Sequence, residues 1–173
     1  AEHMLGSAKM AGTISTCNSI AGIIGVALFI VIGILNRRIG SRYMSGINCI
    51  IAGITYIGVL NAPNPVVYTI MMAVTCGTIM SAGYLCGGGL VANWFPKKKG
   101  IVMGTMGHNL ATAIYVPLIL FLVGRFGVTR ACYPISIGCI ILGIVGILFV
   151  RDTPFERGYY PDHVSKEVYD EFY

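Results

Sequence analysis

A single titratable side chain stands inside one long uncharged stretch of this sequence. Between residues 100 and 124, His108 is the only His, Lys, Arg, Asp or Glu. Because the ordinary pKa of imidazole lies close to physiological pH, such a group can carry a proton. Helical spacing places Thr105, Thr112 and Tyr115 on the same face. This polar stripe predicts a water-accessible path for a solute, and the alternative is hydrogen bonding between packed helices.

Two further stripes of small and polar residues occur at helical spacing. Their members are Gly77, Ser81, Tyr84 and Gly88 in one stripe, and Asn18, Gly22 and Gly25 in the other. We take Ser81, Tyr84 and Asn18 as additional path candidates, with interhelical hydrogen bonding as the same alternative. Two glycine pairs, Gly83-x-x-x-Gly87 and Gly100-x-x-x-Gly104, have the spacing typical of close helix contacts.

The residue sets typical of enzymes do not accompany these side chains. His108 has no Ser or Cys partner in a nucleophile-elbow motif, and neither an HExxH motif nor a phosphate-binding loop occurs. The glycine-rich "CGGGL", residues 86–90, lies inside an apolar stretch, where helix packing explains it better than nucleotide binding. The six cysteines form no CxxC pair. We therefore predict a protein that is not an enzyme and has no cofactor, no metal site and no nucleic-acid partner.

The elements that must hold these residues are long apolar segments. Hydrophobic residues make up 55% of the chain and charged residues 11%, whereas soluble domains carry roughly 25% charged residues. A transmembrane helix needs about 20 mostly apolar residues, and in lipid the helix satisfies its own backbone. We predict an all-α integral membrane protein with transmembrane helices over residues 11–35, 44–60, 66–92, 100–123 and 131–150.

Basic residues predict how these helices are oriented. They gather in alternate connections, with Arg37, Arg38 and Arg42 after the first helix, Lys97, Lys98 and Lys99 after the third, and Arg151 after the last. The positive-inside rule places these connections in the cytoplasm and Trp94 at the membrane interface, while Arg125 and Arg130 are a mild exception on the outer side. We expect a multi-pass protein of the cell membrane with a cytoplasmic C-terminus.

The two ends of the chain differ from the apolar middle. Residues 1–10, "AEHMLGSAKM", contain HM and GS pairs that resemble cloning scars, so we interpret them as a leader left by cloning or as an extracytoplasmic leader. Residues 151–173 are expected to be a cytoplasmic linker. Within it, Val164, Val168 and Phe172 fit one face of a short surface helix. An odd number of helices that starts outside predicts that one preceding helix is absent and that the chain is a piece of a larger protein.

One segment carries a family resemblance. "GILNRRIGSR", residues 33–42, resembles the loop between the second and third helices of the major facilitator superfamily, which reads G-x-L-x-D-R-x-G-R-R/K. The matching residues are Gly33, Leu35, Arg38, Gly40 and Arg42, and Arg37 stands at the family's acidic position. The resemblance implies that this loop takes part in the conformational change of a carrier, in which the family's aspartate helps to hold the two halves together.

Two further segments extend the resemblance to one branch of that superfamily. "NWFPKKKGIVMG", residues 93–104, resembles the W-F-P-x-x-R-G-x-x-x-G stretch of oxalate–formate antiporters and monocarboxylate transporters. "TPFERGYYPD", residues 153–162, is similar to the segment after the sixth helix in the oxalate–formate branch. Over residues 11–162 the resemblance implies helices two to six of a twelve-helix carrier.

The resemblance implies a function for the complete carrier. It is a secondary active transporter of a small organic anion, such as oxalate, formate or a monocarboxylate, that works by alternating access with its site at the membrane midplane. Antiport against a counter-anion and coupling to a proton both stay open. This chain would be an incomplete half whose partners are the lipid bilayer, the anion and the missing C-terminal half. The alternative is a short non-transporting membrane protein that acts as a scaffold or self-associates into a pore.

Overall fold

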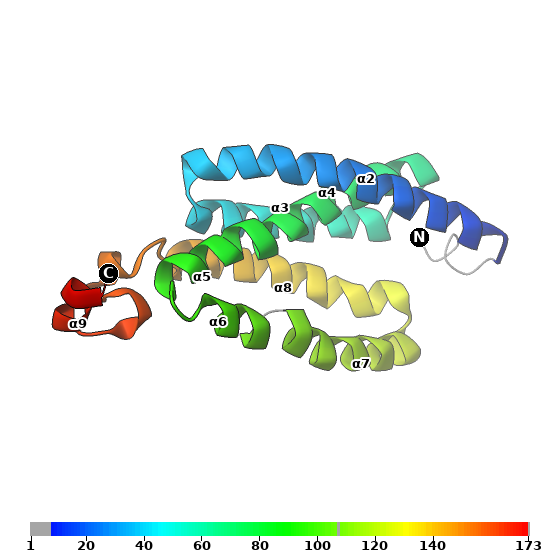
Figure 1. The fold of residues 1–173 in the computed structure, drawn as a ribbon. Helices are drawn as coiled ribbons and strands as arrows, with labels where there is room; N and C mark the ends of the chain where they lie inside the picture. Colours follow the sequence, from blue (N-terminus) through cyan, green and yellow to red (C-terminus); the bar gives the residue numbers. More distant parts are fainter. Residues whose placement is uncertain (1–7, 107, 173) are drawn as a thin grey trace.

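The fold is a bundle of long helices with a short folded tail (Figure 1). The computed structural model describes residues 8–106 and 108–172, without the side chains of residues 8–11, 105–106, 108–112, 168 and 171–172. In chain order its elements are α2 (Ala8–Ile39), α3 (Ser41–Leu60), α4 (Pro65–Met80), the π-helix η1 (Ser81–Gly87), α5 (Gly88–Trp94), α6 (Lys99–Met106), α7 (His108–Phe126), α8 (Val128–Phe149), the 3₁₀ turns η2 (Pro154–Arg157) and η3 (Pro161–His163), and α9 (Lys166–Phe172). The described residues contain no strand, and the predicted all-α class is confirmed.

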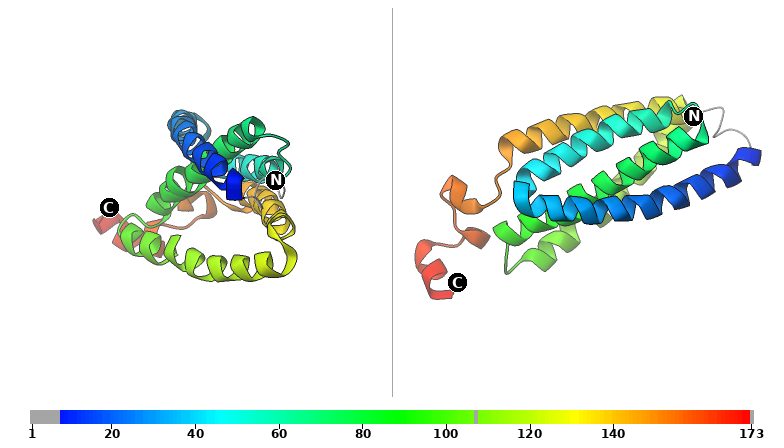
Figure 2. Two further views of the ribbon diagram at one scale, coloured as in Figure 1. Left: turned by 90° about the vertical axis from the view of Figure 1, so that its right-hand side faces the viewer. Right: turned by 90° about the horizontal axis from the view of Figure 1, so that it is seen from above.

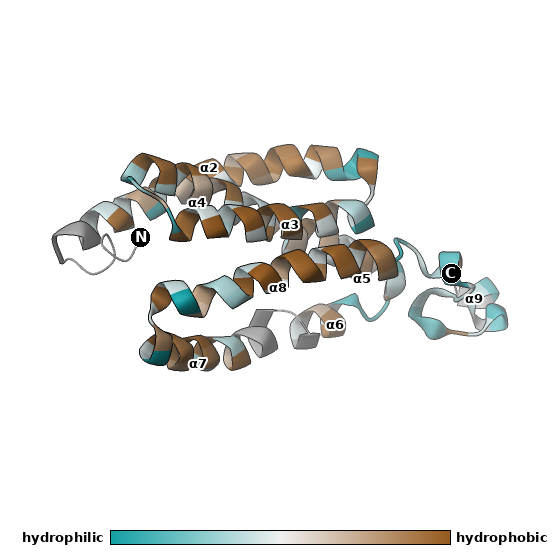
Figure 3. Ribbon diagram, turned by 180° about the vertical axis from the view of Figure 1, so that it is seen from behind, coloured by the Kyte–Doolittle hydropathy of each residue, from teal (hydrophilic) through white to brown (hydrophobic). Residues whose placement is uncertain are grey.

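Among the described residues, four helices are long and apolar enough to cross a membrane. They cover Gly12–Ile39, Ser41–Leu60, Pro65–Trp94 and Val128–Phe149. The first of them runs past the predicted end at residue 35, through Arg37 and Arg38 to Ile39. Basic residues in a last turn interact favourably with the helix dipole, so a helix does not end where its charge begins. Figure 2 shows these helices lying side by side, and Figure 3 shows apolar helices beside a hydrophilic tail.

The predicted helix over residues 100–123 is formed by two elements. α6 and α7 follow one another on either side of residue 107, which lies outside the described residues. Within α7, residues Ala113–Phe126 form an apolar helix. Pro117 lies inside α7, and the helix continues through it to Phe126. In Figure 1, α7 runs beside α8 and away from α2.

Glycines allow the two closest helix crossings. Where α3 crosses α8, a Cβ added at Gly143 would lie 2.7 Å from the carbonyl oxygen of Gly46. Where α2 crosses α4, a Cβ added at Gly77 would lie 3.0 Å from the carbonyl oxygen of Gly25. These backbones approach each other because no side chain separates them.

The glycine pairs singled out by spacing lie elsewhere. No described atom comes within 4 Å of a Cβ added at Gly83, Gly100 or Gly104, and the neighbour of Gly87 is a carbonyl of its own helix. The described residues show no interhelical contact at Gly83-x-x-x-Gly87 or Gly100-x-x-x-Gly104. Spacing along one helix does not say which face a second helix covers.

Candidate functional site

The loop between α2 and α3 is joined to the segment after α8. Gly40 has a φ of 97° and stands before the first turn of α3 without a capping side chain of its own. In its place, Oδ1 of Asp152 accepts the backbone N–H of Arg42 at 2.8 Å. The guanidinium of Arg42 donates from Nε and Nη2 to the carbonyl oxygen of Ile147, at 2.8 and 2.6 Å. The end of α8 and the start of α3 are thus held together by a carboxylate and a guanidinium.

The last residues of α5 and the turn after it are bonded to the same segment. Trp94 donates its indole N–H to the carbonyl oxygen of Arg151 at 3.0 Å, and the side-chain amide of Asn93 donates to the carbonyl oxygen of Asp152 at 3.0 Å. Further along, the buried carboxylate of Asp162 accepts the backbone N–H of Lys97 at 3.1 Å. Three stretches that are far apart in the sequence, residues 33–42, 93–104 and 150–162, therefore meet at one end of the bundle.

A cavity of about 250 Å³ lies in the bundle, between α3, α4, α7 and α8. Its lining residues with a hydroxyl or thiol group are Tyr56, Thr75, Cys76, Tyr115, Ser136 and Cys139, and the rest of its wall is apolar. None of the residues that line it carries a formal charge. Its size suits a small solute.

Most hydroxyl groups around this cavity have partners within the protein. Thr75 Oγ1 lies 2.7 Å from Thr55 Oγ1 and donates to the carbonyl oxygen of Met71 at 2.9 Å. Ser136 Oγ donates to the carbonyl oxygen of Cys132 at 3.2 Å. A hydroxyl that donates to the preceding turn still has lone pairs to offer. The wall therefore offers hydrogen-bonding groups but no charge that would neutralise an anion.

The described residues hold no group of three His, Cys, Asp or Glu side chains placed to bind a metal ion. The family model described as "Major Facilitator Superfamily" matches residues 1–166 of the chain. The chain belongs to the major facilitator superfamily. No curated protein and no solved structure matches it.

The chain belongs to a superfamily of transporters, and its described residues include four long apolar helices. Together these observations indicate a multi-pass membrane protein. Membership of the superfamily favours a transporter over the alternative of a short scaffold or pore protein. All three segments that meet at the end of the bundle lie within the residues that the family model matches.

The stripe predicted around His108 falls partly outside the described side chains. Tyr115 lies on α7 and contributes to the wall of the cavity. Thr105 belongs to α6, and His108 and Thr112 belong to the first turns of α7, but their side chains lie outside the described residues. The structure therefore connects one of the four stripe residues to the cavity of this superfamily member.

The other path candidates lie in different surroundings. Asn18 Oδ1 on α2 accepts the hydroxyl of Tyr68 on α4 at 2.9 Å. Ser81 is fully buried, whereas 54% of Tyr84 is exposed. Both residues belong to η1, where hydrogen bonds run from i to i+5, so the face spacing of an ordinary α-helix does not hold through this segment. Their place on a solute path stays a prediction.

The residues of the loop motif, Gly33, Arg38, Gly40 and Arg42, differ in their contacts. A Cβ added at Gly33 would lie 3.2 Å from Leu85, so this glycine packs against η1. Arg38 is exposed, whereas Gly40 and Arg42 contact the segment after α8. Sequence reasoning missed Asp152 because Arg42, the partner of its carboxylate, lies more than a hundred residues away. The signal available was an acidic residue next to Arg151 at the end of an apolar segment.

Proposed function

We propose that this chain forms part of a secondary active carrier that moves a small organic anion by alternating access. The match to the superfamily over residues 1–166 carries the proposal for transport. The W-F-P turn at Trp94 and the "TPFERGYYPD" segment support the narrower branch, by their resemblance to oxalate–formate antiporters and monocarboxylate transporters. On this proposal the five predicted helices belong to the first half of the carrier, and a second half completes the site.

The cavity between α3, α4, α7 and α8 is the proposed solute path within this half. Tyr115 contributes its hydroxyl to the wall, and His108 stands seven residues earlier on the same helix. Seven residues are close to two helical turns, so the two positions share a face. Because no lining residue is charged, an anion held here requires a cation from His108 or from outside this chain. Antiport and proton coupling differ in whether His108 changes its protonation during the cycle.

The loop at Gly33, Arg38, Gly40 and Arg42 is the proposed conformational element. In superfamily members this loop carries an acidic residue, and here that position holds Arg37. Asp152 supplies a carboxylate to the same loop from the end of α8. We propose that this contact is stable in one conformation of the carrier and is loosened in another.

The proposed orientation places this end of the bundle, with the linker of residues 151–173, in the cytoplasm of a cell-membrane protein. Cysteines introduced at Ser41 and Lys98, in a background without the native cysteines, should react with membrane-impermeant thiol reagents only when the cytoplasmic side is open. Labelling of either position from outside intact cells would overturn the orientation.

The substrate proposal is tested at His108 in the complete carrier. His108→Gln keeps side-chain size and hydrogen bonding but removes the titratable group. Proteoliposomes should show reduced uptake of labelled oxalate or formate, or uptake that no longer responds to pH. His163→Gln is the matched control, because His163 is exposed in the tail. An unchanged rate and pH profile for His108→Gln would exclude the titrating role, and absence of uptake of both anions by the wild-type carrier would exclude oxalate and formate as its substrates.

A further inference from the structure

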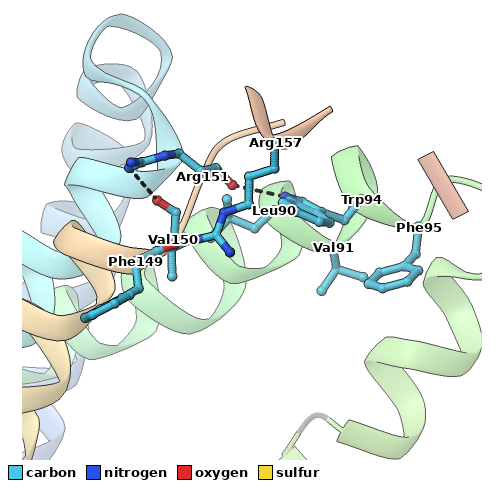
Figure 4. Close-up of a pocket in the computed structure, with 8 residues that line it drawn as sticks. All are labelled: Leu90, Val91, Trp94, Phe95, Phe149, Val150, Arg151 and Arg157. Carbon is cyan, nitrogen blue, oxygen red and sulfur yellow. Dashed lines mark hydrogen bonds between the residues drawn. The ribbon is translucent and has the colours of Figure 1, made fainter. Parts of the chain in front are cut away.

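A second hollow opens at the end of the bundle, where α5 and α8 both end (Figure 4). Its volume is about 330 Å³. Apolar and aromatic side chains form most of its wall, among them Leu90, Val91, Trp94 and Phe149. Arg151 and Arg157 complete it. An apolar wall with two guanidinium groups beside it is typical of a site for an amphiphile rather than for a fully solvated ion.

The guanidinium of Arg157 has spare hydrogen-bonding capacity. Its Nη2 donates to the carbonyl oxygen of Phe149 at 2.6 Å. In the described part of the chain, no carboxylate oxygen lies within 4 Å of the Arg157 guanidinium. Since a guanidinium has five N–H donors in a planar fork, most of those on Arg157 are open to a ligand. Phosphate oxygens fit such a fork in a bidentate arrangement.

The nearby carboxylates are directed to other partners. Asp152 and Asp162 each accept a backbone N–H from a different connection. Glu156 accepts the N–H and hydroxyl of Thr153 at 3.3 Å each, and its second oxygen lies 4.0 Å from Nε of Arg151. One arginine is therefore partly neutralised, and the other is left with its charge at the mouth of the hollow.

Local structure holds both the cation and the apolar wall in place. Arg157 is the last residue of η2, which has a capping box of Thr153 and Glu156 at its start. Gly158, with a φ of 73°, ends this turn in the left-handed conformation. On the opposite wall, the indole of Trp94 is oriented by its hydrogen bond to the backbone of Arg151. Few side-chain rotations would be lost when a ligand binds.

We propose that this hollow binds one anionic phospholipid. Its phosphate lies against Arg157, and an acyl chain lies along the wall of Phe149 and Leu90. The position at the ends of two membrane-spanning helices is the level at which headgroups meet acyl chains, and Trp94 is a residue typical of that level. A dissolved phosphate would use the arginine but leave the apolar wall in water. A phospholipid contacts both the arginine, through its phosphate, and the apolar wall, through an acyl chain. It is therefore the occupant that fits both features of the hollow.

Trp94 offers a direct readout, because it is the only tryptophan in the chain and lines the hollow. The full chain is reconstituted into phosphatidylcholine vesicles that contain a fixed fraction of bromine-labelled lipid, either phosphatidylglycerol or phosphatidylcholine. Bromine on the acyl chains quenches indole fluorescence on contact. We expect the labelled phosphatidylglycerol to quench Trp94 more strongly, corresponding to a relative binding constant of about fivefold for a single arginine at an anionic surface.

Two variants locate the preference. Arg157→Gln should bring the ratio of the two quenching constants close to one. Lys99→Gln removes the same charge from the neighbouring turn but outside the hollow, and should keep the wild-type ratio. If Arg157→Gln does not reconstitute, Arg157→Lys keeps the charge without the planar fork and should give an intermediate ratio.

Three results would overturn the proposal. Equal quenching by both labelled lipids in the wild-type protein would show that no anionic lipid is preferred. An equal effect of Lys99→Gln and Arg157→Gln would show a diffuse attraction to the surface instead of a site. Loss of the preference on adding inorganic phosphate, but not on adding sodium chloride of the same ionic strength, would show that free phosphate is the ligand.

Discussion

The start of α3 is capped by a carboxylate from the other end of the chain. Removing that carboxylate should therefore lower the free energy of unfolding by a measurable amount. The first N–H groups of a helix lack partners within it, and a capping side chain normally accepts one. Gly40 has no side chain for this, and Asp152 accepts the N–H of Arg42 instead. Asp152→Ala leaves that donor without its partner, while the backbone carbonyl of residue 152 still accepts from Asn93.

The size of the loss follows from the type of contact. Replacing a capping side chain by alanine costs about 1 kcal/mol, and the charge at a helix N-terminus contributes about 0.3–1 kcal/mol more. Hydrogen bonds to charged groups fall in a similar range, about 1.5–3 kcal/mol. We expect Asp152→Ala to lower the free energy of unfolding by about 2 kcal/mol. Asp152→Asn keeps an acceptor oxygen and loses the charge, so we expect about 0.5–1 kcal/mol.

Unfolding of the purified chain in mixed micelles of dodecylmaltoside and sodium dodecyl sulfate, followed by far-ultraviolet circular dichroism, measures this difference. Asp170→Ala is the matched control, because Asp170 is exposed on α9. The order of stability should be wild type and Asp170→Ala first, then Asp152→Asn, then Asp152→Ala. If Asp152→Ala unfolds within 0.5 kcal/mol of the control, the carboxylate does not cap α3 and the reasoning fails.

Three further substitutions test the packing by the same unfolding titration. Gly77→Ala adds a Cβ 3.0 Å from a carbonyl oxygen of α2 and should destabilise the protein by about 1–3 kcal/mol. Its control is Gly146→Ala, which has no described atom within 4 Å of the added Cβ and should change stability by less than about 0.5 kcal/mol. Equal effects of the two substitutions would contradict the crossing of α2 and α4. Gly40→Ala places a side chain at a φ of 97° and should cost about 1–2 kcal/mol, and no loss would show that the loop relaxes. Tyr68→Phe removes a hydroxyl that donates to Asn18 and should cost about 0.6 kcal/mol, with a double-mutant cycle giving zero coupling if the bond does not form.

The fold class and most helix positions could be predicted because they depend on local composition. Charges are absent from residues 44–96, and any segment of that length in lipid must be helical. Helix ends were less accurate, since α2 carries Arg37 and Arg38 inside its last turn. A charged residue ends the apolar character of a segment, but it does not end its hydrogen bonding.

Contacts between helices could not be predicted in this way. Gly25 and Gly77 touch, whereas Gly83 and Gly100, which have the more suggestive spacing, have open space around them. Which glycine meets another helix depends on how both helices are rotated about their axes. The spacing of residues in one helix gives the faces of that helix alone. The π-helix η1 adds a local shift of face that the α-helical period does not contain.

The candidate site was predicted in part for the same reason. Tyr115 lines the cavity from α7, which is helical from His108 to Phe126. Tyr56, Thr75 and Ser136 share that cavity from three other helices, and no spacing along one helix links them. Asp152 was missed because its role arises from a contact across 110 positions of the chain.

Charge and cavity are separated along the helices, and this separation makes the functions of the two regions distinguishable. The cavity wall is uncharged, whereas Arg42, Asp152 and Arg157 lie where the helices end. Substitutions at the helix ends should therefore change unfolding or lipid preference without altering which solute the proposed path selects. Substitutions at Tyr115 should do the reverse, because this side chain lines the cavity and no ion pair depends on it. A variant at the helix ends that changed the solute preference would contradict this separation of the two regions.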